Sequence, residues 1–147
     1  MKMLLFVFLI PFQLIAQPFS NSEVASWKKQ AGNITIIRDH YGIPHVYGKT
    51  DADAVFGLLY AQCEDDFRRV EMNYIEKLGR LAEVNGEKDL YNDLLIRLVI
   101  DSADAIKDYN NANDTLKRIL NAFADGINYF LHKNQKIKLH IFFRYLV

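Results

Sequence analysis

The chain has 147 residues, enough for one domain with its own hydrophobic core. Half of the residues are hydrophobic and 24% are charged, a balance typical of soluble globular proteins. Lys plus Arg and Asp plus Glu both number 18, so no overall positive field exists to attract nucleic acid. The single cysteine, Cys63, excludes an intrachain disulfide and a multi-cysteine zinc site.

Residues 1–16 have the pattern of a secretory signal peptide. Lys2 is followed by an apolar run over residues 3–10, and Ala16 suits a cleavage site, although Leu14 stands where a small residue is preferred. The apolar run is too short to cross a hydrocarbon layer of about 30 Å. We expect the mature protein to be periplasmic or secreted; the alternative is a buried N-terminal helix.

A lead-in segment and a β-hairpin follow. Residues 17–32 are polar and predict a short helical turn at about 24–28. The β-branched run at 33–38 predicts a strand, and residues 39–42 predict a turn in which Gly42 takes positive φ. A second extended stretch covers 43–47, where a proline without an N–H group favours an edge strand.

A long amphipathic helix is predicted from Thr50, whose side chain suits an N-cap. Apolar residues recur at steps of three and four up to Leu81, with charged residues opposite. Because this run is long for one helix, we expect a break at 62–66 or at Gly79, and an end near Gly86.

Two further helical segments are predicted. One helix is expected over residues 90–110 and a loop over 110–113. A last amphipathic helix begins at an N-cap, either Asn113 or Asp114, and carries its apolar face to Leu131.

Few side chains suggest chemistry. Asp39, His40 and His45 lie near one another in sequence, but alternating strand side chains need not converge on a metal, so a structural role is favoured. Cys63 lies on the apolar stripe beside acidic residues, which oppose thiolate formation, so a buried inert thiol is favoured.

A charge cluster and many aromatic side chains have two interpretations each. Asp65 and Asp66 with Arg68 and Arg69 either form an acid–base pair of carboxylates or, as we favour, a solvated helix face with local ion pairs. Aromatic residues make up 13% of the chain and line either an acyl pocket or, as helical spacing favours, the core.

Residues 34–86 resemble the N-terminal, α-chain region of penicillin acylase precursors, a family that includes acyl-homoserine-lactone acylases. The resemblance extends less specifically over about 30–134. The residues that carry it are Arg38, Asp39, Gly42, Ile43, Pro44, His45, Val46, Tyr47, Asp53, Ala54, Gly57, Tyr60, Ala61, Gln62, Glu71, Met72, Gly79, Ala82, Glu83 and Gly86. The pattern departs after Gln62, where the family usually has Asp and then Arg and this chain has Cys63 to Arg68.

The resemblance implies an α+β fold, the N-terminal part of an αββα N-terminal-nucleophile hydrolase: a β-hairpin, then mostly α-helices. In such enzymes an exported zymogen cleaves itself, and a serine at the new β-chain start attacks an amide carbonyl, with its own α-amino group as base. The resemblance therefore assigns no catalytic, cofactor-binding or metal-binding residue to this chain. It implies calcium in the full-length family member, a β chain as partner and a small amide substrate.

We interpret the chain as four segments: signal peptide 1–16, lead-in 17–32, acylase-like region 33–134 and an aberrant tail 135–147. After Asp125 the chain has no acidic residue, and its end does not match the family's continuation. The expected function is that of a truncated N-terminal fragment of an amidohydrolase, of the class removing acyl groups from penicillin-like or homoserine-lactone amides, inactive alone. A non-catalytic secreted helical binding module is the alternative, and membrane association is the least favoured.

Overall fold

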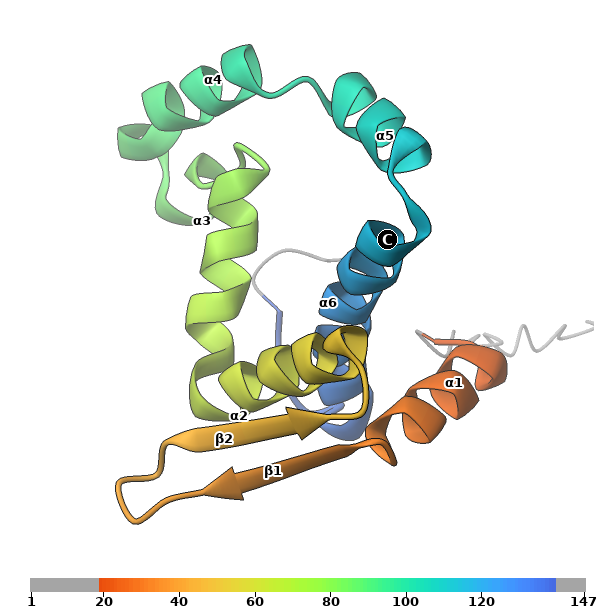
Figure 1. Cartoon of the computed structure of the whole chain (residues 1–147). Helices are drawn as coiled ribbons and strands as arrows, with labels where there is room; N and C mark the ends of the chain where they lie inside the picture. The colour runs from red at the N-terminus through yellow and green to blue at the C-terminus, as the bar shows by residue number, and fades with distance from the viewer. Residues whose placement is uncertain (1–18, 140–147) are drawn as a thin grey trace, which may run out of the picture.

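The chain folds into helices and a single β-hairpin that lies at one edge of the molecule, as the computed structural model in Figure 1 shows for residues 19–139. The elements in chain order are α1 (Asn21–Ala31), β1 (Ile34–Arg38), β2 (Pro44–Gly48), α2 (Asp51–Lys77), α3 (Ala82–Asn85), a 3-10 turn η1 (Glu87–Asp89), α4 (Leu90–Val99), α5 (Ser102–Asn111) and α6 (Asp114–Lys133). This mostly helical arrangement with one antiparallel sheet confirms the coarse fold prediction. The predicted signal peptide and most of the predicted tail lie outside the described residues.

The hairpin has the predicted strands and turn. β1 and β2 pair antiparallel, with registers running from Ile34 opposite Gly48 to Arg38 opposite Pro44. Asp39 Oδ1 accepts hydrogen bonds from the backbone N–H groups of Tyr41 and Ile43, at 2.9 and 3.0 Å. Gly42 takes φ 83°, as the turn requires. Within residues 19–139 each strand pairs only with the other, so both outer edges are unpaired.

Helix α1 is longer than the turn expected at residues 24–28. Ser20 and Glu23 form a reciprocal capping box, in which Glu23 N–H donates to Ser20 Oγ and Ser20 N–H donates to Glu23 Oε2. Trp27, only 2% exposed, anchors the helix. The helix therefore depends on a buried contact with a distant part of the chain, which local periodicity does not reveal.

Helix α2 is divided at one of its two predicted breaks and ends at the other. Thr50 caps it by accepting from Asp53 N–H at 3.2 Å. Asp66 leaves helical geometry, with φ −156° and ψ 76°, and its Oδ1 accepts from Arg69 N–H at 3.0 Å. Asp66 thus caps a second limb, which meets the first at a steep angle in Figure 1. The second limb ends at Lys77, just before Gly79 at φ 61°.

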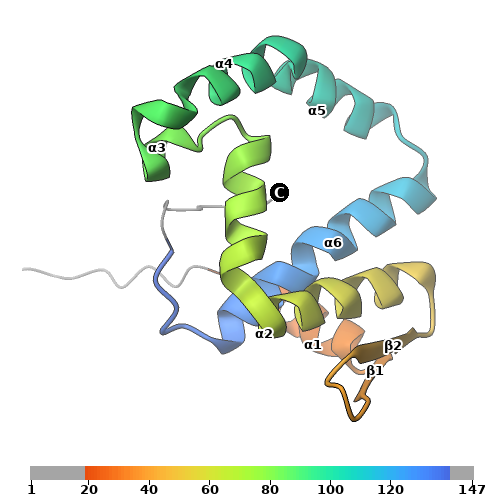
Figure 2. The ribbon, with the colours of Figure 1, turned by 90° about the vertical axis from the view of Figure 1, so that its left-hand side faces the viewer.

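Helix α6 crosses the first limb of α2 (Figure 2), and the two helices together supply most of the core. One buried cluster contains Leu59, Cys63, Ile127 and Phe130, and a second contains Trp27, Phe56 and Ala122. Gly126 allows the close crossing, because a Cβ there would lie 2.5 Å from the carbonyl oxygen of Phe56. None of the helices in residues 19–139 is sufficiently long and apolar to traverse a bilayer.

The prediction of a single helix over residues 90–110 is wrong. The segment forms two helices, α4 and α5, because Asp101 accepts from Ala103 N–H at 2.8 Å and so caps a new helix. Asn113 is the N-cap of α6, accepting from Leu116 N–H at 2.9 Å. Together α4 and α5 form an arch from the far end of α2 to the start of α6 (Figures 1 and 2).

Candidate functional site

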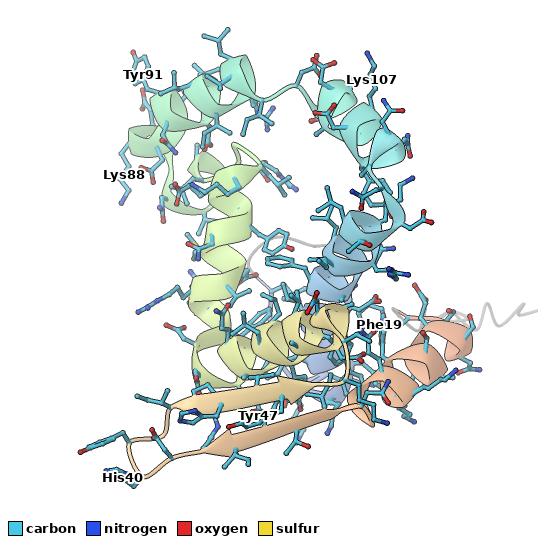
Figure 3. All side chains as sticks on the ribbon, viewed as in Figure 1. Phe19, His40, Tyr47, Lys88, Tyr91 and Lys107 are labelled. Atoms are coloured by element: carbon cyan, nitrogen blue, oxygen red, sulfur yellow. The ribbon has the colours of Figure 1, made fainter. Side chains whose placement is uncertain are left out.

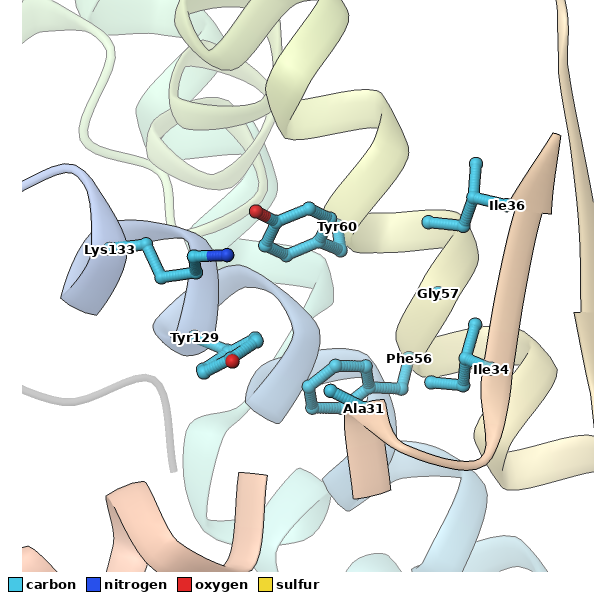
Figure 4. A pocket seen from close by; sticks show the side chains of 8 residues that line it. All are labelled: Ala31, Ile34, Ile36, Phe56, Gly57, Tyr60, Tyr129 and Lys133. Atoms are coloured by element: carbon cyan, nitrogen blue, oxygen red, sulfur yellow. The ribbon is translucent and has the colours of Figure 1, made fainter. Parts of the chain in front are cut away.

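A hollow of about 240 Å³ lies between the inner face of the hairpin, α2 and α6 (Figure 4). Gly57 makes this arrangement possible, since a Cβ at that position would lie 2.7 Å from the side chains of Ile34 and Val46. The lining residues come from four elements, α1, β1, α2 and α6: Ala31, Ile34, Ile36, Phe56, Gly57, Tyr60, Tyr129 and Lys133. The wall is therefore mainly aliphatic and aromatic.

Lys133 supplies the positive charge at this hollow. Its Nζ lies 5.8 Å from the ring centre of Tyr60 and 5.7 Å from that of Tyr129, within cation–π range. Burial raises the pKa of Tyr60, so its phenol stays neutral at ordinary pH. A second, more polar hollow of about 530 Å³ shares Tyr60 and Lys133 with the first. An apolar wall beside an ammonium suits a small acyl chain or carboxylate, and these groups offer binding rather than bond cleavage.

The charge cluster on α2 has a partner that sequence reasoning missed. Arg38 of β1 lies 3.3 Å from Glu64 and 2.7 Å from Asp65, and it also donates to the carbonyl oxygen of Gly42 at 2.9 Å. Hydrogen bonding to Glu64 is the main cause that raises the pKa of Arg38. These carboxylates therefore fasten the hairpin to α2. The resemblance to the family singled out Arg38. Its two acidic partners, however, lie 26 or more positions away in the sequence and could not be identified from it.

The other half of the cluster is local, as favoured. Asp66 pairs with Arg69 at 3.4 Å within the same turn, while Arg68 lies 3.5 Å from Glu71. Glu71 is only 3% exposed, and burial raises its pKa. Glu71 is one of the residues that carry the resemblance to the acylase family, so one of those residues is a buried carboxylate.

His40 lies in the hairpin turn, and His45 lies near the start of β2. His45 Nε2 is 3.4 Å from Asp39 Oδ2, and the ring of His40 lies 3.7 Å from that of Tyr41. Burial alone would raise the pKa of Asp39, but hydrogen bonds from the turn's backbone and from His45 lower it. Across residues 19–139 no three side chains of His, Cys, Asp or Glu come together as a metal-ligand set. The arrangement stabilises a turn.

Cys63 lies in the core cluster on α2 at 1% exposure. Burial raises the pKa of its thiol to about 12, which keeps it protonated and unreactive. The inert interpretation of this cysteine agrees with its position.

Aromatic side chains divide between core and hollow. Phe67 and Phe130 stack at 5.5 Å in the main core, whereas Tyr60 and Tyr129 face the hollow with ring centres 5.7 Å apart. Tyr47 is 60% exposed on the outer face of the hairpin. Some of the aromatic side chains therefore pack in the core, as favoured. The sequence did not distinguish these residues from Tyr60 and Tyr129, which line the hollow.

Comparison with known proteins gives consistent similarities. Residues 33–146 match the profile of the penicillin amidase family. The chain is 33% identical over 106 residues to an acyl-homoserine lactone acylase, QuiP, of Pseudomonas syringae pv. tomato, covering 72% of this chain and 13% of that protein. It is 31% identical over 107 residues to the penicillin G acylase of Escherichia coli, covering 72% of this chain and 12% of that protein.

A solved structure shares the fold. The thermostable penicillin G acylase from Alcaligenes faecalis superposes with a TM-score of 0.64 at 23% identity, over 70% of this chain and 55% of that one. The chain therefore spans only about an eighth of the length of the curated relatives, at 12% and 13%. With a profile match across most of its length, this chain belongs to the penicillin amidase family.

Proposed function

We propose that this chain is the N-terminal framework of an exported amide-hydrolysing acylase. The complete enzyme would remove an acyl group from a linear amide, of the penicillin or acyl-homoserine-lactone class. Similar proteins named for each of these two activities support the proposal. A further relative, from a Pseudomonas strain, is named as a penicillin acylase proenzyme and is 30% identical over 98 residues.

One observation carries this proposal: the residues that resemble the family hold the framework together. Asp39 and Gly42 form the hairpin turn, Arg38 fastens the hairpin to α2, and Gly57 lets the two approach. Gly79 sits where α2 ends, with a conformation that few other residues adopt. Their roles are positional, which fits a framework whose reacting groups lie elsewhere.

The reaction proposed for the complete enzyme uses a serine that begins a separate chain. Its hydroxyl oxygen attacks the amide carbon, its proton passes to the serine's own α-amino group, and the amine leaves with a proton. Water then releases the acyl group. In the proposed αββα fold, the unpaired edges of β1 and β2 join a larger sheet.

Two further expectations belong to the same proposal. In the full-length enzyme, calcium is expected to be bound by residues of the later α chain and of the β chain, as the resemblance to the family implies. Export to the periplasm or medium follows from the apolar pattern of residues 1–16. N-terminal sequencing of the exported product is expected to show that residues 1–16 have been removed.

The test is an activity assay of the purified 147-residue chain with a chromogenic acyl-anilide and with an acyl-homoserine lactone. We expect no turnover by the chain alone, and turnover by the positive control, the Escherichia coli penicillin G acylase. Steady turnover that survives replacement of every serine in the chain would contradict the proposal. Sequencing the DNA downstream shows whether the remaining acylase is encoded there.

A secreted binding module is the second candidate, favoured by the hollow beside Lys133. An apolar wall of about 240 Å³ next to an ammonium suits a short aliphatic carboxylate. Titration with hexanoate, followed by amide chemical shifts of Tyr60 and Tyr129, tests it. Saturable shifts that Lys133→Gln abolishes and Lys117→Gln leaves intact would favour the module.

A further inference from the structure

Helix α4 buries one acidic residue and leaves most of its apolar residues exposed. Its one buried residue is Asp93, at 5% exposure. Leu94 and Leu98 are 55% and 83% exposed, and Leu95 and Val99 are 59% and 75% exposed. This polarity is the reverse of that of a surface helix, which turns its apolar stripe inward.

The apolar residues form one continuous surface on α4. Residues four positions apart lie one above the other on a helix, so two neighbouring rows result. We call this surface the arch face; it consists of Leu90, Tyr91, Leu94, Leu95, Leu98 and Val99. Ile106 of α5 is a further exposed apolar residue of the arch, at 62%. Figure 3 shows these helices standing away from the hairpin and α1, with Tyr91 directed outward.

Polar contacts hold the arch in place at both ends. At the α4 end, Asp93 accepts from the N–H groups of Leu81 and Ala82 at 2.8 and 2.7 Å, and Arg97 Nε donates to the carbonyl oxygen of Gly79 at 2.9 Å. At the α5 end, Tyr109 donates its hydroxyl to Asn121 at 2.8 Å. The position of the arch thus depends on hydrogen bonds that leave its apolar side uncovered.

The length of the relatives indicates what covers this side. The matched stretch is 13% of the acyl-homoserine lactone acylase and 12% of the Escherichia coli penicillin G acylase. Even the solved chain with the same fold is matched over only 55% of its length. Most of the polypeptide of the two curated relatives, and just under half of the solved chain, is therefore available to pack against this region.

We propose that the arch face is the docking surface for the remaining acylase polypeptide, and that Leu94 and Leu98 are its central anchors. This inference rests on the proposed function and names the partner that the framework binds. A second copy of this chain is the competing occupant. Because the arch face is apolar, the docking segment is expected to be apolar as well.

The experiment is a chimera in which the matched 106-residue stretch replaces its counterpart in the Pseudomonas syringae acyl-homoserine lactone acylase. Three versions are compared: the unchanged stretch, Leu94→Lys with Leu98→Lys, and the control Asn92→Lys on the same helix, where Asn92 is exposed and polar. We expect the unchanged and control chimeras to be soluble and active. The double variant is expected to lose at least about tenfold in assembled, active enzyme.

The outcomes separate the two proposals. An unchanged chimera that fails to assemble contradicts the proposed function and the inference that rests on it. An active double variant contradicts the docking surface alone.

Measurements on the 147-residue chain complete the test. Because both leucines are exposed, the double variant is expected to melt at the same temperature as the parent. A lower melting temperature would mean that the arch face is part of this chain's own core and would overturn the inference. A dimer in size-exclusion chromatography that the double variant dissociates would assign the face to a second copy instead.

Discussion

Trp27 donates its indole N–H to Asp125 Oδ1 at 2.7 Å and so joins α1 to α6 across 98 positions of sequence. The ring of Phe19 packs edge-on against the indole, with centroids 5.0 Å apart. Burial raises the pKa of Asp125, and the Trp27 hydrogen bond only partly offsets this effect. The contact is therefore specific but contains a carboxylate whose charge is poorly solvated.

The titration of Asp125 predicts how stability depends on pH. A folded pKa raised above the unfolded value means that the stabilising contribution is present at low pH and is lost as the pH rises through the folded pKa. Asp125→Asn keeps the acceptor oxygen without the charge. We expect the variant to be at least as stable as the parent at pH 7, with its advantage shrinking toward pH 4. Urea unfolding at several pH values measures this, and Asp104→Asn is the exposed control; an advantage that grows on acidification contradicts the argument.

Gly126 is expected to tolerate no side chain. A Cβ there would lie 2.5 Å from the carbonyl oxygen of Phe56 and 3.2 Å from Leu59 Cβ, so Gly126→Ala separates α6 from α2. The overpacking is expected to cost about 1–3 kcal/mol, more than the gain in helix propensity. Gly32→Ala, at a position with φ −66°, is the matched control and is expected to change stability by under about 0.5 kcal/mol. Equal stability of the two variants would refute the close-crossing explanation.

Asp93 is expected to keep the connection from α2 to α4 ordered. Asp93→Ala leaves the N–H groups of Leu81 and Ala82 without their acceptor, at a cost of about 1–3 kcal/mol. Because the arch has few other contacts, the loss is expected to be local. Hydrogen exchange should quicken over residues 79–99 while the core around Ile127 stays protected. Asp89→Ala serves as the control, and uniform quickening throughout the chain would point to global destabilisation instead.

Cys63 is expected to be protected from thiol reagents in the folded chain. Its thiol is 1% exposed and its pKa is raised to about 12. At pH 8 an aromatic disulfide reagent should react with it only at the rate of unfolding, and rapidly in denaturant. Fast reaction in native buffer would show that the α2–α6 core opens readily.

Local signals in the sequence predicted local structure well. Thr50 and Asn113 cap helices because their side chains reach N–H groups three residues away. The turn at Asp39 and Gly42 follows from the same short-range chemistry. Each of these contacts closes within a few positions, so residue type and spacing suffice to identify it.

Long-range packing was outside the reach of sequence patterns. Helix α1 depends on Trp27 meeting Asp125, and the hairpin's attachment depends on Arg38 meeting Asp65. The hollow beside Lys133 likewise requires four elements, α1, β1, α2 and α6, to be placed together. The division of residues 90–110 is a different failure: Asp101 caps α5 through Ala103, two residues away, and this local signal was overlooked.

The crossing of α2 and α6 has a consequence for the order of synthesis. Leu59 and Cys63 leave the ribosome well before Ile127 and Phe130, which cover them. Until α6 has emerged, the part of the α2 stripe that α6 covers faces solvent, and the nascent chain is open to aggregation.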